Sequence, residues 1–209
     1  TVNEIGHFGG FCPERDFREK IASLYQKFNQ PEEALKEYLL LLKKDPNDGT
    51  LYFKVGELFE QRDRTDKAIN YYRKALELDP RNSDAHYKLG LLLYRTKKPV
   101  EAKDELEKAI SIKPENFKAY FYIGRLLKEN HDFIGALHAF EKAQRDPEQK
   151  VKALIERGVC YMGMKNFDNA ASEFERALKL SQNAVSNETL YARYFLGVSY
   201  EKTRNIDKA

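Results

Sequence analysis

The chain offers few side chains that could act as nucleophiles, general bases or metal ligands. Its histidines and cysteines are His7, His86, His131, His138, Cys12 and Cys160. A helical zinc site needs two histidines four residues apart, and no pair here has that spacing. The sequence also lacks a G-x-x-x-x-G-K-[ST] phosphate loop and a G-x-S-x-G nucleophile turn. We therefore expect no catalytic residue, no metal site, no cofactor and no enzymatic activity in this chain.

The balance of charge also argues against nucleic acid as a partner. The 209 residues carry a formal net charge of +3 that is spread along the chain without a basic block. A nucleic-acid surface needs Lys and Arg gathered on one face, so RNA binding is the weakest alternative. No apolar run approaches the roughly 18 residues of a membrane-spanning helix, so we expect no membrane span.

The two cysteines give a further expectation about the compartment. If the chain is a linear stack of helices, Cys12 and Cys160 lie far beyond the roughly 7 Å between Cα atoms that a disulfide allows. Two free thiols fit a reducing compartment, so we expect a cytoplasmic location. The sequence starts at Thr1 and not at Met, so we expect the natural protein to begin earlier.

A 34-residue period runs through most of the sequence. Pro46, Pro80 and Pro114 are spaced by 34 residues, and a glycine follows each proline ten positions later. Apolar residues recur at helical spacing on both sides of a short polar turn in each period, so each unit reads as two helices. Pro31 and Pro99 fit the first turn of a second helix. Four other prolines, Pro46, Pro80, Pro114 and Pro147, fit positions just after its end.

The recurring glycines stand inside the first helix of each unit. A glycine there costs roughly 1 kcal/mol relative to alanine, so its recurrence needs a physical reason. An alanine follows twelve positions later, as at Gly56 and Ala68 or Gly90 and Ala102. We interpret both small residues as contact points where two antiparallel helices approach closely and neither side chain protrudes.

The period, the glycine, the alanine and the closing proline together resemble the tetratricopeptide repeat (TPR). The resemblance implies an all-α, right-handed α-solenoid of about five and a half helix-turn-helix repeats. The expected repeats span 15–48, 49–82, 83–116, 117–150, 151–184 and, in part, 190–209 of a solenoid over 15–209. Residues 1–14, which include the stretch GHFGGF, are expected to form a flexible or capping lead-in.

The fifth and sixth repeats depart from this pattern. Arg157 stands where an apolar residue is expected, and the insertion SQNAVSNET delays the sixth repeat, which also lacks its second helix. Terminal repeats need a polar cap. We therefore expect this end to be the least stable part of the solenoid and the natural chain to continue beyond Ala209.

The resemblance also implies that the first helices line a concave groove that binds a partner. The residues at the groove positions are Phe53, Glu57, Tyr87, Leu91, Phe121, Arg125, Ile155, Val159, Tyr194 and Val198. Their aromatic and aliphatic character predicts an exposed apolar strip, which typically marks an interaction site. We expect a protein segment there, as an amphipathic helix or, alternatively, an extended peptide, and self-association is a further option.

Some proteins of this family grip a terminal carboxylate with Lys and Asn side chains on successive first helices. The corresponding positions here hold Glu19 and Ser23, then Lys54, then Asp84 and Lys88. The frame one repeat later holds Phe53, Glu57, Lys88, Lys118 and Tyr122. Neither frame supplies the Lys and Asn pair, so this mode is disfavoured.

The function that these features favour is a protein-interaction scaffold or adaptor that supports the assembly of a multiprotein complex. The alternative is an accessory TPR module of a larger enzyme or of a secretion or envelope machine. RNA binding is the third and weakest hypothesis.

Overall fold

The computed structural model describes residues 13–181 and 186–203, and these residues form eleven helices and no strand. The chain divides into two compact units, one up to Ala85 and one from His86. The first unit holds α1 (Pro13–Lys27), α2 (Pro31–Lys44), α3 (Gly49–Gln61) and α4 (Thr65–Leu78). The second holds α6 (Pro99–Ile112), α7 (Phe117–Glu129), α8 (Phe133–Ala143), α9 (Pro147–Gly163), α10 (Phe167–Leu180) and α11 (Asn187–Lys202). The division falls within α5 (Ser83–Arg95).

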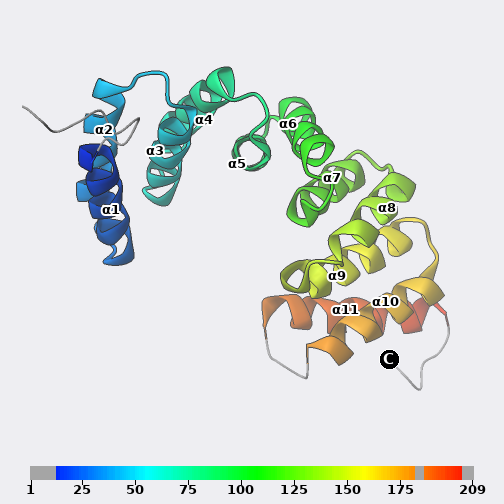
Figure 1. The fold of residues 1–209 in the computed structure, drawn as a ribbon. Helices are drawn as coiled ribbons and strands as arrows, with labels where there is room; N and C mark the ends of the chain where they lie inside the picture. Colours follow the sequence, from blue (N-terminus) through cyan, green and yellow to red (C-terminus); the bar gives the residue numbers. More distant parts are fainter. Residues whose placement is uncertain (1–12, 182–185, 204–209) are drawn as a thin grey trace, which may run out of the picture. The chain divides into compact units, whose positions relative to one another are not determined.

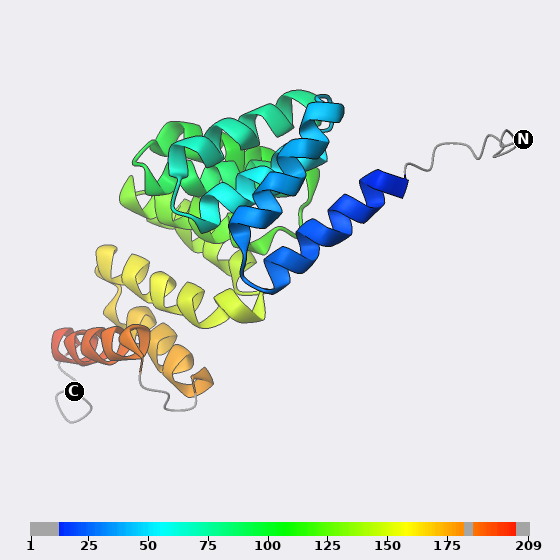
Figure 2. The same ribbon diagram turned by 90° about the vertical axis from the view of Figure 1, so that its left-hand side faces the viewer.

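Within each unit the helices pack mainly on their neighbours in sequence (Figure 1). In the first unit α1 packs on α2, α2 on α3 and α3 on α4, and Figure 2 shows α1 and α2 as an antiparallel pair. In the second unit the same order continues from α6 to α11, and the first helices α7, α9 and α11 also pack on one another. The predicted all-α fold of stacked helix pairs is confirmed. None of the described helices combines the length and apolarity needed to cross a membrane.

The helix ends follow the prolines and the capping residues. The second helices α2, α4 and α6 end two residues before Pro46, Pro80 and Pro114, because the residue before a proline disfavours the helical conformation. Pro31 and Pro99 are the first residues of α2 and α6, as predicted. The prediction for Pro147 is wrong: this proline begins α9, where Asp146 caps the helix by accepting a hydrogen bond from the backbone N–H of Glu148. A proline fits that first position because its missing N–H would have no helical partner.

The turns between paired helices share one backbone conformation that the sequence did not reveal. Five non-glycine residues spaced by 34 adopt a left-handed φ of 54° to 61°, and they are Asn29, Asp63, Lys97, His131 and Lys165. Asn, Asp and His tolerate this region better than most residues. The two lysines lack that tolerance, so the repeat geometry and not the local sequence imposes the turn.

The recurring glycines make room for a large side chain on the partner helix. A Cβ added to Gly124 would lie 2.7 Å from the ring of Phe140, and one added to Gly158 would lie 2.6 Å from the ring of Phe174. Tyr72 covers Gly56 at 2.7 Å in the same way. The prediction of a close helix contact at glycine is therefore confirmed, but a side chain does protrude there: the residue sixteen positions later fills the space above the glycine.

A second contact between paired helices changes its chemistry from repeat to repeat. It joins residues that are 19 positions apart in the sequence. In the first repeat Arg18 Nη1 lies 2.7 Å from Glu37 Oε2, and in the third His86 Nδ1 lies 2.6 Å from Glu105 Oε2. In the second repeat the rings of Tyr52 and Tyr71 pack with their centroids 5.9 Å apart. Burial alone would raise the pKa of Glu105, but hydrogen bonds from His86 and Lys108 hold that pKa below its ordinary value. The two residues of each pair are therefore chemically complementary, but the kind of contact differs from one repeat to the next.

The same contact explains Arg157 in the fifth repeat. Leu154 occupies the position opposite Glu173 there, and a leucine cannot pair with a carboxylate. Arg157, one turn further along α9, reaches Glu173 at 3.2 Å, and Arg176 reaches it at 3.0 Å. Glu173 is only 6% exposed, so the two arginines compensate a buried charge. Arg157 is thus a structural partner of Glu173, at a position where the repeat pattern predicts an apolar residue.

Replacing Gly124 with alanine tests the fit over the glycine. We expect Gly124→Ala to lower the free energy of unfolding by about 1–3 kcal/mol because the added methyl group meets the Phe140 ring. Helix propensity alone predicts a gain of roughly 1 kcal/mol. In a double-mutant cycle, Phe140→Ala should make Gly124→Ala less costly, since the methyl group then fills part of the vacated space. Additive or stabilising effects in urea unfolding would contradict this packing.

Two variants test the buried ion pair. We expect Arg157→Leu to lower the free energy of unfolding by roughly 2–3 kcal/mol because Glu173 then keeps only the half-exposed Arg176. The double variant Arg157→Leu/Glu173→Leu should recover most of that loss, because a buried pair can be replaced by apolar residues at little cost. If the single and double variants unfold at the same urea concentration, the pairing does not explain Arg157.

Candidate partner-binding groove

The first helices of the second unit enclose a groove. Since α7 packs on α9 and α9 on α11, side chains from all three helices surround a hollow of about 550 Å³. Tyr122 and Arg125 come from α7, Lys152 and Glu156 from α9, and Tyr191 from α11. The groove therefore combines aromatic rings with charges of both signs.

The starts of α9 and α11 position the side chains from these two helices. Asp146 caps α9, so Lys152 lies in its second turn. Ser186 and Thr189 form a reciprocal capping box at the start of α11, which places Tyr191 about one turn into that helix. Both side chains thus project from fixed helix starts and not from loops.

An aromatic cluster borders the groove on the side of α7. The ring of Tyr122 lies with its centroid 5.6 Å from Tyr94, 6.3 Å from Tyr87 and 5.6 Å from Phe121. Aromatic pairs at such separations attract beyond their burial. The Tyr94 hydroxyl donates a hydrogen bond to Glu129 at 2.6 Å, and burial together with this bond raises the pKa of Tyr94 to about 12. Tyr94 therefore stays protonated and acts as a fixed support.

The charges in the groove are partly paired. The Glu156 carboxylate lies between Lys128, which donates a hydrogen bond to it, and the Arg125 Nε at 3.6 Å. The Arg125 guanidinium also stands 5.3 Å from the centre of the Tyr94 ring, within cation–π range.

Lys152 is exposed and forms no hydrogen bond or ion pair with any residue that the structure describes. Hydrogen bonds, and to a lesser extent the charge of Lys152, lower the pKa of the nearby Glu148 and Glu188, the second of which also lines the groove. The Lys152 ammonium group nonetheless keeps its hydrogen-bond donors for a ligand.

The structure brings together only some of the predicted groove residues. Phe121, Arg125 and Ile155 line the groove, and Tyr87 adjoins it through Tyr122. However, Leu91, Phe121 and Ile155 are only 6%, 6% and 5% exposed. The expectation of a continuous exposed apolar strip is therefore wrong. Phe121 packs in a buried cluster with Phe140 of α8 and Cys160 of α9. Ile155 packs in another buried cluster with residues of α10 and α11.

The remaining predicted residues lie outside the hollow. Val159 packs against the buried cluster around Phe174, and Val198 is partly buried. Tyr194 is 66% exposed, and its ring meets the edge of Phe195 at 5.0 Å. These residues are not among those that line the groove.

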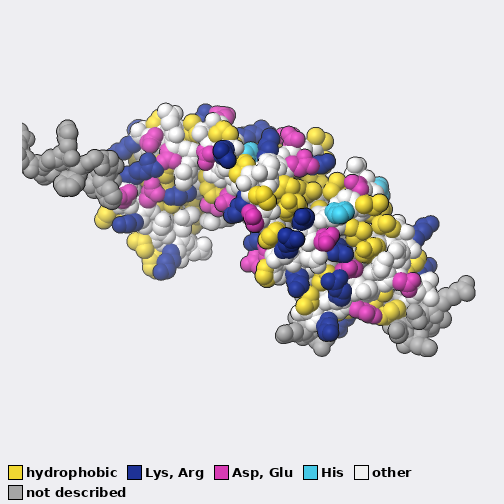
Figure 3. All heavy atoms as spheres, turned by 45° about the vertical axis from the view of Figure 1, so that its right-hand side comes forward, with side chains coloured by type: hydrophobic (Ala, Val, Ile, Leu, Met, Phe, Trp, Pro, Cys, Tyr) yellow, Lys and Arg dark blue, Asp and Glu magenta, His cyan; other side chains and the backbone are white. Residues whose placement is uncertain are grey.

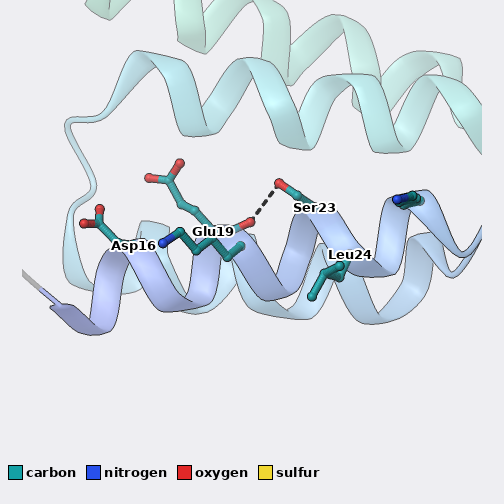
Figure 4. Close-up of a pocket in the computed structure, with 6 residues that line it drawn as sticks. Asp16, Glu19, Ser23 and Leu24 are labelled. Carbon is teal, nitrogen blue, oxygen red and sulfur yellow. Dashed lines mark hydrogen bonds between the residues drawn. The ribbon is translucent and has the colours of Figure 1, made fainter.

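In the first unit the groove positions of α1 carry the polar side chains Glu19 and Ser23. Phe53 packs on Tyr72 with centroids 5.6 Å apart, and Glu57 is partly exposed. A shallow hollow of about 630 Å³ lies along α1 (Figure 4), where the Ser23 hydroxyl donates to the carbonyl oxygen of Glu19 at 2.9 Å. The Glu19 carboxylate accepts a hydrogen bond from Lys54 at 2.8 Å, which lowers its pKa. Only α1 contributes to this hollow, and no aromatic ring lines it.

Sequence reasoning missed eight of the residues that line the groove, among them Tyr122, Lys152 and Tyr191. Lys152 and Tyr191 each stand three positions before a predicted residue, Ile155 and Tyr194 respectively. Residues three apart on a helix are neighbours on its surface, so this spacing was the available signal.

The side chains with chemical potential serve structural roles or lie apart. His86 is 7% exposed and pairs with Glu105, while His131 occupies a turn and His138 is exposed on α8. Cys160 is a free, fully buried thiol, and burial raises its pKa to about 12. Within 13–181 and 186–203, no three His, Cys, Asp or Glu side chains are grouped to hold a metal ion. His7 and Cys12 lie outside these residues.

Comparisons with known proteins agree with the repeat geometry. A family model described as "TPR repeat" matches residues 56–97, and one described as "Tetratricopeptide repeat" matches 83–116 and 151–184. No curated protein sequence matches the chain.

Solved structures share the fold at low sequence identity. MamA from Desulfovibrio magneticus RS-1 is 22% identical with a TM-score of 0.75, covering 85% of this chain and 100% of that one. YrrB, described as a TPR protein with an unusual peptide-binding site, is 24% identical with a TM-score of 0.72, covering 85% and 90%. PilW, described as a type IV pilus biogenesis factor, is 17% identical with a TM-score of 0.76, covering 94% and 90%.

The burial of Cys160 gives a direct chemical test. In a Cys12→Ser variant, which leaves Cys160 as the sole thiol, we expect Ellman's reagent at pH 8 to react at least a hundredfold more slowly with native than with urea-unfolded protein. The reason is that the thiolate is the reactive species and burial keeps it rare and shielded. Similar rates in both states would show that α9 does not hold this thiol in the core.

Proposed function

We propose that this chain, which belongs to the tetratricopeptide repeat family and is a protein-interaction scaffold, binds a segment of a partner protein in the groove between α7, α9 and α11. By holding that segment the chain would support the assembly of a multiprotein complex. The proposal includes no catalysis by this chain.

The observation that carries the proposal is the combination of aromatic rings and an exposed lysine in one hollow. Tyr122 and Tyr191 offer apolar surface with little side-chain entropy to lose, and Lys152 offers an ammonium group that donates no hydrogen bond to any described residue. Clefts that bind ligands generally combine apolar walls with a few polar groups that fix orientation. YrrB has the same fold and is described as a TPR protein with an unusual peptide-binding site, which supports a peptide ligand here.

The groove favours a segment that carries an apolar anchor and a carboxylate. The anchor would rest on Tyr122 and Tyr191, and the carboxylate would pair with Lys152. An amphipathic helix suits the open shape, because its residues at i, i+3 and i+4 can reach the helices on both sides. An extended peptide is the alternative mode, and a second copy of the chain is the alternative occupant that the sedimentation experiment below identifies.

Quantitative pull-down from native lysate tests the groove. We expect Lys152→Glu/Tyr191→Ala to reduce recovery of the bound partner at least tenfold, equivalent to about 1.4 kcal/mol. Both side chains are exposed, so the fold should persist. The matched control Lys36→Glu/Leu40→Ala changes exposed residues on α2 and should recover the partner fully.

Equal recovery by wild type and by Lys152→Glu/Tyr191→Ala would overturn the groove as the binding site. Sedimentation velocity on the purified wild type identifies self-association: a dimer that the groove variant abolishes would make a second copy the occupant.

A further inference from the structure

We propose that a second binding surface lies at the start of α6 and α8, and that it takes a segment of a partner protein that carries basic and apolar side chains. This surface is separate from the α7–α9–α11 groove. The evidence starts from one position of the repeat.

The second residue of each second helix is acidic in three repeats and apolar in two. These residues are Glu32, Asp66, Val100, Ile134 and Asp168. An acidic side chain in the first turn interacts favourably with the helix dipole. Val100 and Ile134 are uncharged, so two neighbouring repeats lack this favourable interaction with the helix dipole.

Folding does not explain why apolar residues replace acidic ones at positions 100 and 134. Val100 is 82% exposed and Ile134 is 66% exposed, so neither side chain fills the core. Both are β-branched and therefore bring no helix propensity in return. Figure 3 shows hydrophobic side chains gathered on the surface of the second unit, with charged side chains among them. Two exposed apolar residues at equivalent positions are better explained by a partner than by the fold.

A cleft adjoins Val100 and gives the surface depth. It measures about 570 Å³ and lies between the first half of α6 and the end of α7, with Val100 and Leu127 among its apolar walls. Asn130, which also lines the cleft, begins the turn that leads to α8 and Ile134. A side chain held in the cleft would therefore belong to a segment that also passes near Ile134.

The charges that line the cleft decide the class of partner. Three carboxylates, those of Asp104, Glu107 and Glu129, face one lysine, Lys103, so the lining has a net charge of −2. The existing pairs are long, since Lys103 stands 3.7 Å from Glu107 and Lys108 stands 3.8 Å from Asp104. Lys97 and Lys98, in the preceding turn, do not line the cleft. A segment with Lys or Arg beside its apolar residues complements this lining, and an acidic segment would be repelled.

The test uses random peptides displayed on phage, selected on the wild-type protein after depletion on Val100→Gln/Ile134→Gln. We expect the selected peptides to combine apolar residues with Lys or Arg. By fluorescence anisotropy they should bind Val100→Gln/Ile134→Gln at least tenfold more weakly than the wild type. Asp104→Asn/Glu107→Gln should weaken binding severalfold. The groove variant Lys152→Glu/Tyr191→Ala should bind them as the wild type does, which keeps this result independent of the groove.

A folding control accompanies the selection. Val100→Gln/Ile134→Asp removes both apolar side chains without adding a charge to the acidic cleft, and it should leave the Tm unchanged or raise it, because an acid at position 134 suits the start of α8. A lower Tm would assign these side chains a structural role and overturn the proposal. Selected peptides that are acidic or uncharged, or that bind Val100→Gln/Ile134→Gln equally well, would also overturn it. A wild-type dimer that Val100→Gln/Ile134→Gln dissociates would replace the basic segment with a second copy.

Discussion

The fit of a large side chain over a glycine on the partner helix is the interaction on which the rest of the structure depends. Tyr72, Phe140 and Phe174 are fully buried in this way, and burial of one such side chain is worth roughly 1.5–3 kcal/mol. The glycine allows the ring to lie directly on the backbone, so the paired helices approach at a fixed point. Because every repeat is fixed at the same point, its first helix presents the same face to the next repeat. The groove between α7, α9 and α11 is a consequence of that regularity.

Polar contacts add a second level that differs from repeat to repeat. His86 pairs with Glu105, and Arg157 pairs with Glu173, each between the two helices of one repeat. A buried carboxylate without its partner is strongly destabilising, so each of these helices is tied to its own partner and not to that of another repeat. This provides specificity that the uniform glycine contact cannot supply.

The sequence predicted the helix pairs and the glycine contacts because both depend on local spacing that repeats every 34 residues. It could not predict that Pro147 begins α9, since a proline suits both the residue after a helix and the first residue of one. It also misjudged Leu91, Phe121 and Ile155, because the exposure of a side chain depends on how the helices around it pack, and the repeat spacing does not specify that packing. Lys152 was missed for a related reason: its availability depends on which residues of neighbouring helices pair with one another. The sequence shows that Val100 and Ile134 stand where other repeats have an acidic residue, but it does not show that these two side chains are exposed.

Site-resolved hydrogen exchange on wild type and Phe174→Ala tests most directly whether the glycine contact holds each helix pair. Removing this ring should lower amide protection in α9 and α10 together, since the ring joins these two helices at Gly158. Protection in α6 should persist, because repeats contact mainly their neighbours. Loss of protection in α10 alone, or an equal loss throughout the second unit, would contradict the account.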